Sequence, residues 1–94
     1  MLLARIVGNV TATRKAERLD GMRFLLARPY AQPGVAPTAG LLVAADTLGA
    51  GPGEDVLLAT GRAARIAVGA ADEAPIDAAV MAIVDGMEVD KKAG

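Results

Sequence analysis

A glycine-rich stretch, DTLGAGPGEDV (46–56), is the first place in this sequence where ligand chemistry could occur. Gly49, Gly51 and Gly53 alternate with other residues, and glycine-rich loops can bind phosphate through backbone N–H groups. A dinucleotide-binding fingerprint needs the spacing G-x-G-x-x-G between a strand and a helix. Here the spacing is G-x-G-x-G, and the residues that follow have the pattern of a strand. We therefore interpret the stretch as a strand-to-strand connection in which glycine allows positive φ.

Charged residues form two further candidate sites. The basic cluster at 14–18 also carries an acid and lacks the aromatic side chains on which single-stranded nucleic acids stack. The acidic cluster at 72–77 is typical of a helix start, where acids are common without a ligand. We interpret both clusters as solvated surface charge.

Asp85 differs from these clusters because it lies in an apolar run, where we expect its carboxylate to be buried. A buried carboxylate needs a partner, and Arg62 and Arg65 are the candidates.

The composition argues against catalysis by this chain. Its 94 residues include no His, Cys, Ser or Trp, so the commonest general base, two common nucleophiles and the best transition-metal ligands are missing. The net charge of −1 gives no strong attraction to nucleic acid or to an anionic membrane. No apolar run approaches the roughly 20 residues of a membrane span. We expect a cytoplasmic protein that is not an enzyme, with no catalytic residue, cofactor or metal and no nucleic-acid or membrane partner.

Short strands separated by turn residues account for most of the chain. Alternation of apolar and polar side chains predicts a strand over residues 2–12, and apolar side chains that share a face predict another over 22–30. Residues 41–46 are a short apolar run with the length of a buried strand, and 54–61 form another short strand closed by Gly61. Gly8, in the middle of the first segment, predicts a bulge or bend of the kind that small barrels need. Asp20-Gly21 is a turn signal that separates the first two strands.

The C-terminal third of the chain has less certain periodicity. Residues 62–74 fit either a helical turn or an irregular strand, and both remain open. Pro75 predicts a short helix to about Val80, followed by a last strand to about Val89. The pattern as a whole favours a mainly β fold, a small closed β-barrel of about five strands, OB-like or SH3-like, with one short helix near the C-terminus. It would form a single domain over 1–89, with a flexible tail at 90–94.

Three blocks of sequence carry a resemblance to a known family. RIVGNVTATRKAERLDGMRFLLARP (5–29) contains V-G-x-V-x-A-T-x-K, VAADTLGAGPGEDVLLATG (43–61) contains A-x-D-x-x-G-A-G-x-G-E-x-V-L, and PIDAAVMAIVD (75–85) reads P-x-D-A-A-x-x-x-I-V-D. In this order they resemble the EutN/CcmL family, the pentameric vertex proteins of bacterial microcompartment shells. One departure lies in GRAAR, where Arg62 and Ala63 replace two serines that are usual in the family.

The resemblance implies an OB-like barrel that assembles into a homo-pentamer and plugs a five-fold vertex of a microcompartment shell. Its expected partners are the hexameric or trimeric shell proteins of the facets. We expect the subunit contacts or the loop at the ring axis to include Asp46, Thr47, Gly49, Gly51, Gly53, Glu54, Gly61, Arg65 and Asp85. Within this set, Asp46 and Glu54 are expected to hold the glycine loop through backbone N–H groups or an arginine.

Two alternatives belong to other functional classes. An OB-like barrel could be a binding module for nucleic acid or oligosaccharide, although the chain has only two aromatic residues, Phe24 and Tyr30. The chain could also be an accessory subunit of an enzyme, with the ring acting as a metabolite pore.

Overall fold

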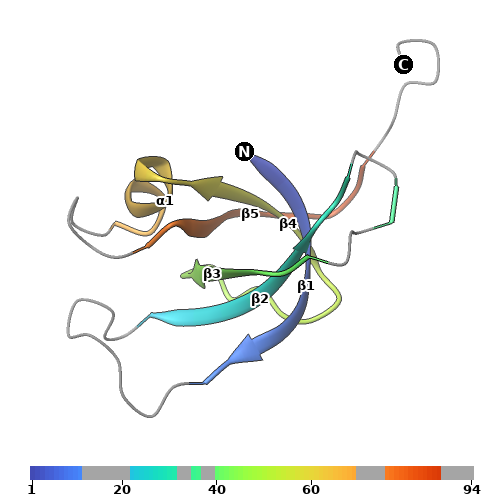
Figure 1. The fold of residues 1–94 in the computed structure, drawn as a ribbon, viewed down its shortest axis with the longest axis horizontal. Coiled ribbons are helices and arrows are strands. Elements are labelled where there is room, and N and C mark those ends of the chain that lie inside the picture. Colours follow the sequence, from blue (N-terminus) through green and yellow to red (C-terminus); the bar gives the residue numbers. More distant parts are fainter. Residues whose placement is uncertain (12–21, 32–34, 37–39, 70–75, 88–94) are drawn as a thin grey trace.

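The computed structural model describes residues 1–11, 22–31, 35–36, 40–69 and 76–87 (Figure 1). Within these residues, five strands form a closed barrel in the order β1-β2-β3-β5-β4. The elements are β1 (Leu2–Val10), β2 (Arg23–Pro29), β3 (Leu42–Asp46), β4 (Asp55–Thr60), α1 (Arg62–Ala67) and β5 (Ala78–Val84). Neighbouring strands are antiparallel except for β3 and β5, which are parallel. The predicted small closed barrel with one short helix is confirmed.

The first four strands lie where the sequence predicts them, with ends that differ by one or two residues. In β1, residues Ala4 and Ile6 are fully buried. The pairing of β1 with β2 shifts register between Ile6 and Gly8, which confirms the predicted bulge. A shift of this kind bends the strand and helps a short sheet to close on itself.

The helix does not lie where the sequence predicts it. The predicted helix from Pro75 to Val80 is wrong, because Ala78–Val80 begin β5. Ala78, Ala79 and Val80 are all buried, since one face of this strand fills the barrel and the other lies under α1. Burial on both faces removes the alternation that identifies a strand.

The helix forms instead within the segment that the sequence leaves open. Its residues, RAARIA, are mostly good helix formers. Gly61, with φ 62°, begins the helix, and Gly69, with φ 71°, follows its end. These positive φ values favour glycine and reverse the chain at both ends. β5 ends at Val84, short of the predicted end at Val89, and residues 88–94 lie outside the described part of the chain.

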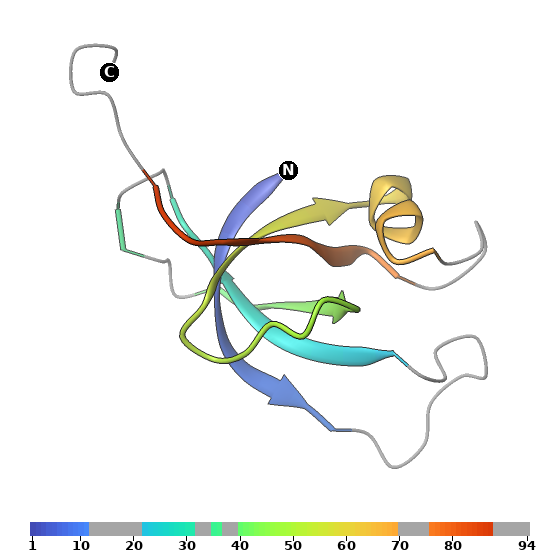
Figure 2. The ribbon, with the colours of Figure 1, turned by 180° about the vertical axis from the view of Figure 1, so that it is seen from behind.

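Two apolar clusters stabilise the barrel. The first fills its interior and consists of Ala4, Ile6, Leu25, Ala27, Ala44, Ala50, Val56, Leu58, Ala78 and Val80. The second lies outside the barrel, where α1 packs on the outer faces of β4 and β5 (Figures 1 and 2). It consists of Ala45, Ala59, Ala64, Ile76 and Ala79. The many alanines let the helix approach the strands closely. No helix of the described residues is long and apolar enough to cross a membrane.

Candidate functional site

The glycine loop connects β3 to β4 and closes one end of the barrel. Ala50 is buried and belongs to the interior cluster. At the end of the loop, the Gly53 N–H donates to the Ile6 carbonyl and the Ile6 N–H donates to the Glu54 carbonyl, each over 2.8 Å. The loop therefore pairs with β1 beside its bulge. Ala50, Gly53 and Glu54 therefore attach the loop to the barrel. The exposed residues 47–49 form the tip of the loop.

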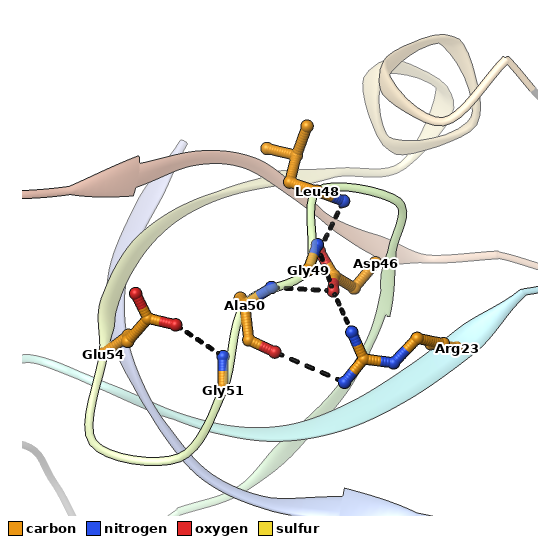
Figure 3. A network of polar contacts seen from close by, with 7 residues as sticks. All are labelled: Arg23, Asp46, Leu48, Gly49, Ala50, Gly51 and Glu54. Atoms are coloured by element: carbon orange, nitrogen blue, oxygen red, sulfur yellow. Dashed lines mark hydrogen bonds and ion pairs between the residues drawn. The ribbon is translucent and has the colours of Figure 1, made fainter.

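Asp46, the last residue of β3, organises the first half of the loop (Figure 3). Its carboxylate accepts the N–H groups of Leu48, Gly49 and Ala50 over 3.0, 3.1 and 3.0 Å. Arg23 donates to the same carboxylate from β2 over 3.3 Å, and to the Ala50 carbonyl over 3.4 Å. The Asp46 side chain has no exposed surface. A buried carboxylate is stable when hydrogen bonds and a cation replace its water, as they do here.

Glu54 holds the second half of the loop. Its carboxylate accepts the Gly51 N–H over 2.7 Å, while its own N–H donates to the Gly51 carbonyl over 3.1 Å. The expectation that Asp46 and Glu54 hold the loop through backbone N–H groups or an arginine is confirmed, with N–H groups at both residues and an arginine at Asp46.

The backbone N–H groups of the glycine loop already have acceptors within the protein. The N–H groups of Leu48, Gly49 and Ala50 donate to Asp46, that of Gly51 donates to Glu54, and that of Gly53 donates to β1. A phosphate cradle needs such groups directed at the ligand. Here the protein's own carboxylates occupy the place that an anion would take, which favours the structural interpretation of the loop.

The three glycines of the loop differ in conformation. Gly49 has φ 85° and Gly53 has φ 90°, in the region that favours glycine. Gly51 is not among the positive-φ residues, so the expectation of positive φ is wrong for this position. A Cβ atom at Gly51 would lie 3.6 Å from the Glu54 carboxylate, an ordinary contact. Thr47 is exposed beside these residues.

Gly61 and Arg65 lie together at the helix, away from the glycine loop in sequence. The Gly61 N–H donates to the Asp77 carbonyl over 2.8 Å, and Arg65 donates to the Ile76 carbonyl over 3.4 Å. Both residues therefore attach α1 to the chain that enters β5. Asp77 itself is exposed, while Asp72, Glu73 and the basic cluster at 14–18 lie outside the described residues.

Asp85 is exposed, so the buried carboxylate expected at this position is wrong. It follows Val84, the last residue of β5, and therefore lies beyond the barrel wall. Arg65, one of its two proposed partners, donates to a backbone carbonyl instead. The apolar residues before Asp85 belong to the strand, and the burial ends with them.

Sequence analysis missed a second polar cluster on the outer surface, made by Arg5, Tyr30 and Asp55. Arg5 and Asp55 are paired across β1 and β4, and their side chains lie 3.2 Å apart. The Tyr30 hydroxyl donates to the same Asp55 oxygen, and the Arg5 guanidinium lies 5.6 Å from the centre of the Tyr30 ring. Burial raises the pKa of the Tyr30 phenol, and its hydrogen bond to Asp55 raises it further. The sequence signal for this cluster is the pair of opposite charges, Arg5 and Asp55, at outward-facing positions of two strands.

The fold and this loop can be compared with known proteins. The family model described as "Ethanolamine utilisation protein EutN/carboxysome" matches residues 1–85. The chain belongs to the EutN/CcmL family. The match extends through β5, and so includes the barrel, the glycine loop and the outer polar cluster.

Curated members of the EutN/CcmL family are similar over nearly their whole length. The carboxysome shell vertex protein CcmL of Thermosynechococcus vestitus is 44% identical over 91 residues, 96% of this chain and 89% of the relative. The bacterial microcompartment shell vertex protein PduN of Salmonella typhimurium is 46% identical over 88 residues, 90% of this chain and 96% of the relative.

Solved structures of EutN/CcmL proteins have the same fold. The ethanolamine utilization protein EutN superposes with a TM-score of 0.86 at 34% identity, covering 95% of this chain and 91% of that one. The GrpN pentameric microcompartment shell protein of Rhodospirillum rubrum superposes with a TM-score of 0.82 at 35% identity, covering 97% of this chain and all (100%) of that one.

Proposed function

We propose that five copies of this chain close into a pentamer that caps a five-fold vertex of a bacterial microcompartment shell. The observation that carries this proposal is the similarity, over nearly the whole chain, to shell vertex proteins from several microcompartments. The similarity to a solved pentameric shell protein supports the ring. The role of the chain is structural rather than catalytic.

The geometry of the glycine loop agrees with a structural role. Asp46 and Glu54 use the loop's N–H groups to fix its shape, rather than leaving those groups for a ligand. Ala50 anchors the loop in the barrel interior. We propose that the loop tip, with Thr47, Gly49 and Gly51, lies at a subunit contact or near the ring axis. A fixed loop suits either place, because little conformational entropy is lost when such a surface associates.

The partners that we propose for the ring are the hexameric or trimeric proteins of the shell facets. The location we propose is accordingly the microcompartment shell in the cytoplasm. The alternative of a binding module for nucleic acid or oligosaccharide has no support from the relatives described above, which are named as shell vertex proteins.

Native mass spectrometry of the purified chain tests the proposed function directly. We expect a species of five chains, and we expect shells made with facet proteins to close only when this chain is present. Monomers or dimers alone, with facet proteins also present, would overturn the proposal. Retardation of a labelled single-stranded oligonucleotide at low salt would instead favour the binding module.

A further inference from the structure

The outer surface of the barrel carries two apolar faces on different strand pairs. The register of the strands identifies them, because residues on either side of a buried position point outward. Leu25 and Ala27 are fully buried in the barrel, so Leu26 and Arg28 of β2 point outward. Val43 of β3 is paired with Leu26 and is 52% exposed. We name Leu26, Arg28, Leu41 and Val43 the β2–β3 face.

The second face lies on β4 and β5. Val56 and Leu58 are fully buried, so Leu57 between them points outward, and it is paired with Ala82 of β5. Met81 lies at the register shift of this strand pair and is 40% exposed. We name Leu57, Met81, Ala82, Val84 and the adjacent Asp85 the β4–β5 face.

The helix covers only one end of this second strand pair. Ala59 and Ala79, which are paired outward-facing residues, lie in the cluster under α1. Leu57 and Ala82 lie further along the same two strands, outside that cluster. The apolar outer surface of β4 and β5 therefore continues beyond the helix as an open face in the single chain.

Charge distinguishes the two faces. Arg28, on the β2–β3 face, has a buried Nε that finds no acceptor in the described part of the chain. A buried donor without a partner destabilises a fold. The β4–β5 face ends at Asp85, an exposed carboxylate. The β2–β3 face thus carries a guanidinium, and the β4–β5 face carries a carboxylate at its edge.

The strand register also places these two charges near the two ends of one row of paired residues. Arg28 is paired with Arg5, Arg5 with Asp55, and Asp55 with Val84, which precedes Asp85. The row runs across β2, β1, β4 and β5. Two strands, β1 and β4, therefore separate Arg28 from the strand that precedes Asp85, so the two charges belong to different faces of one subunit.

We propose that the occupant of each face is a second copy of this chain: the β2–β3 face of one subunit seats on the β4–β5 face of the next, and Arg28 pairs with Asp85 of that neighbour. The inference rests on the proposed pentamer and specifies its contact. A contact between two different faces is what a closed ring of five requires. The apolar side chains of the two faces supply the burial, and the ion pair sets the register.

Val43→Asp and Met81→Asp test the two faces separately. Each places a carboxylate in an apolar contact, so we expect each variant alone to lose the pentamer at concentrations where the unaltered chain is fully assembled. The two variants mixed should form a one-to-one heterodimer, because each retains the face that the other lacks. Ile66→Asp is the matched control: Ile66 is 66% exposed on α1, outside both faces, and this variant should remain pentameric.

Arg28→Glu and Asp85→Lys test the ion pair itself. We expect each single variant to raise the concentration needed for assembly about tenfold, in keeping with a desolvated charge pair. The double variant R28E/D85K restores the pair with the charges exchanged, and should assemble better than either single variant. A double variant that assembles no better than the worse single variant overturns the pairing of Arg28 with Asp85.

Native mass spectrometry reads out all of these variants, and circular dichroism confirms that each is folded. If the unaltered chain is not a pentamer, the proposed function fails. If it is a pentamer and both Val43→Asp and Met81→Asp are also pentamers, only the assignment of the faces fails. Homodimers of either variant alone would overturn the contact between unlike faces, since they require a face to pair with itself.

Discussion

Asp46 and Asp55 each accept a hydrogen bond from an arginine, yet they stabilise the barrel in different ways. The Asp46 side chain is fully buried and also accepts three backbone N–H groups. The Asp55 side chain is 21% exposed, and its other partner is the Tyr30 hydroxyl. Asp46 therefore determines the path of the backbone, whereas Asp55 connects side chains on strands that are already paired through their main chains.

The two carboxylates differ in which groups lose a hydrogen-bond acceptor when the carboxylate is removed. Removal of Asp46 takes the acceptor from three backbone donors, of which that of Ala50 is buried, and the loop conformation loses its support. Removal of Asp55 leaves Arg5, whose side chain is 44% exposed, free to be hydrated. An acid–arginine pair contributes little when water can replace it, and much when the acid also holds the main chain.

The largest expected effect is that of Asp46→Ala. We expect it to lower the free energy of unfolding by about 2–4 kcal/mol, because several hydrogen bonds to a buried charge are lost together. Urea unfolding at fixed protein concentration measures this, since association also contributes to stability. A loss no greater than that of Asp55→Ala would show that the loop is held mainly by Ala50 and the contacts with β1.

Substitution of the loop glycines separates backbone strain from side-chain contact. Gly49→Ala should cost about 1–2 kcal/mol, because φ 85° is unfavourable for residues with a side chain. Gly51→Ala should change stability by less than about 0.5 kcal/mol, since its new Cβ meets only an ordinary contact. Thermal unfolding of the two variants provides the comparison. Equal effects at both positions would contradict the importance of positive φ.

A larger side chain at Gly51 tests the loop's part in assembly. Gly51→Val adds bulk next to Glu54 and is expected to disturb assembly more than it disturbs the fold. The comparison is the fraction of pentamer relative to the shift in melting temperature. If Gly51→Val forms pentamers that cap shells normally, the loop tip does not lie at a subunit contact or at the ring axis.

Asp55→Ala should have a smaller effect than the loss of Asp46. We expect a decrease of about 1 kcal/mol in the free energy of unfolding, mostly from the lost hydrogen bond of Tyr30. The ion pair with Arg5 adds little because that side chain is 44% exposed and water can replace the carboxylate. Tyr30→Phe is the matched control, and it should account for most of the same decrease in urea unfolding.

The smallest expected effect is a shift in the alkaline titration of Tyr30, the only tyrosine of the chain. Folding raises the pKa of this phenol, so the folded state holds the proton more tightly than the unfolded state. Its contribution to stability is therefore present below the ordinary pKa of about 10 and is lost as the pH rises through the folded value. Phenolate absorbance follows the titration. In Asp55→Asn the pKa should fall toward its ordinary value; an unchanged pKa would leave burial as the sole cause.

Much of the barrel could be predicted because its first four strands are short segments, either alternating or apolar, that are bounded by turn residues. Gly8 predicted the register shift in β1, and Asp46 and Glu54 were identified as the polar residues of the loop. Local patterns are informative when one face of an element is buried and the other is exposed. The position of the helix could not be predicted in the same way, since β5 begins with Ala78, Ala79 and Val80, all buried.

Local signals in the chain were enough to identify short strands, glycine turns, the absence of common catalytic residue types and the family resemblance. Only the closed barrel decided which residues meet across strands. It brings Arg5 to Asp55, fifty positions apart, and Arg23 to Asp46. It also leaves Asp85 exposed and covers only one end of β4 and β5 with the helix. Periodicity along a strand is a local property, whereas pairing, closure and the covering of an outer face depend on contacts between distant segments.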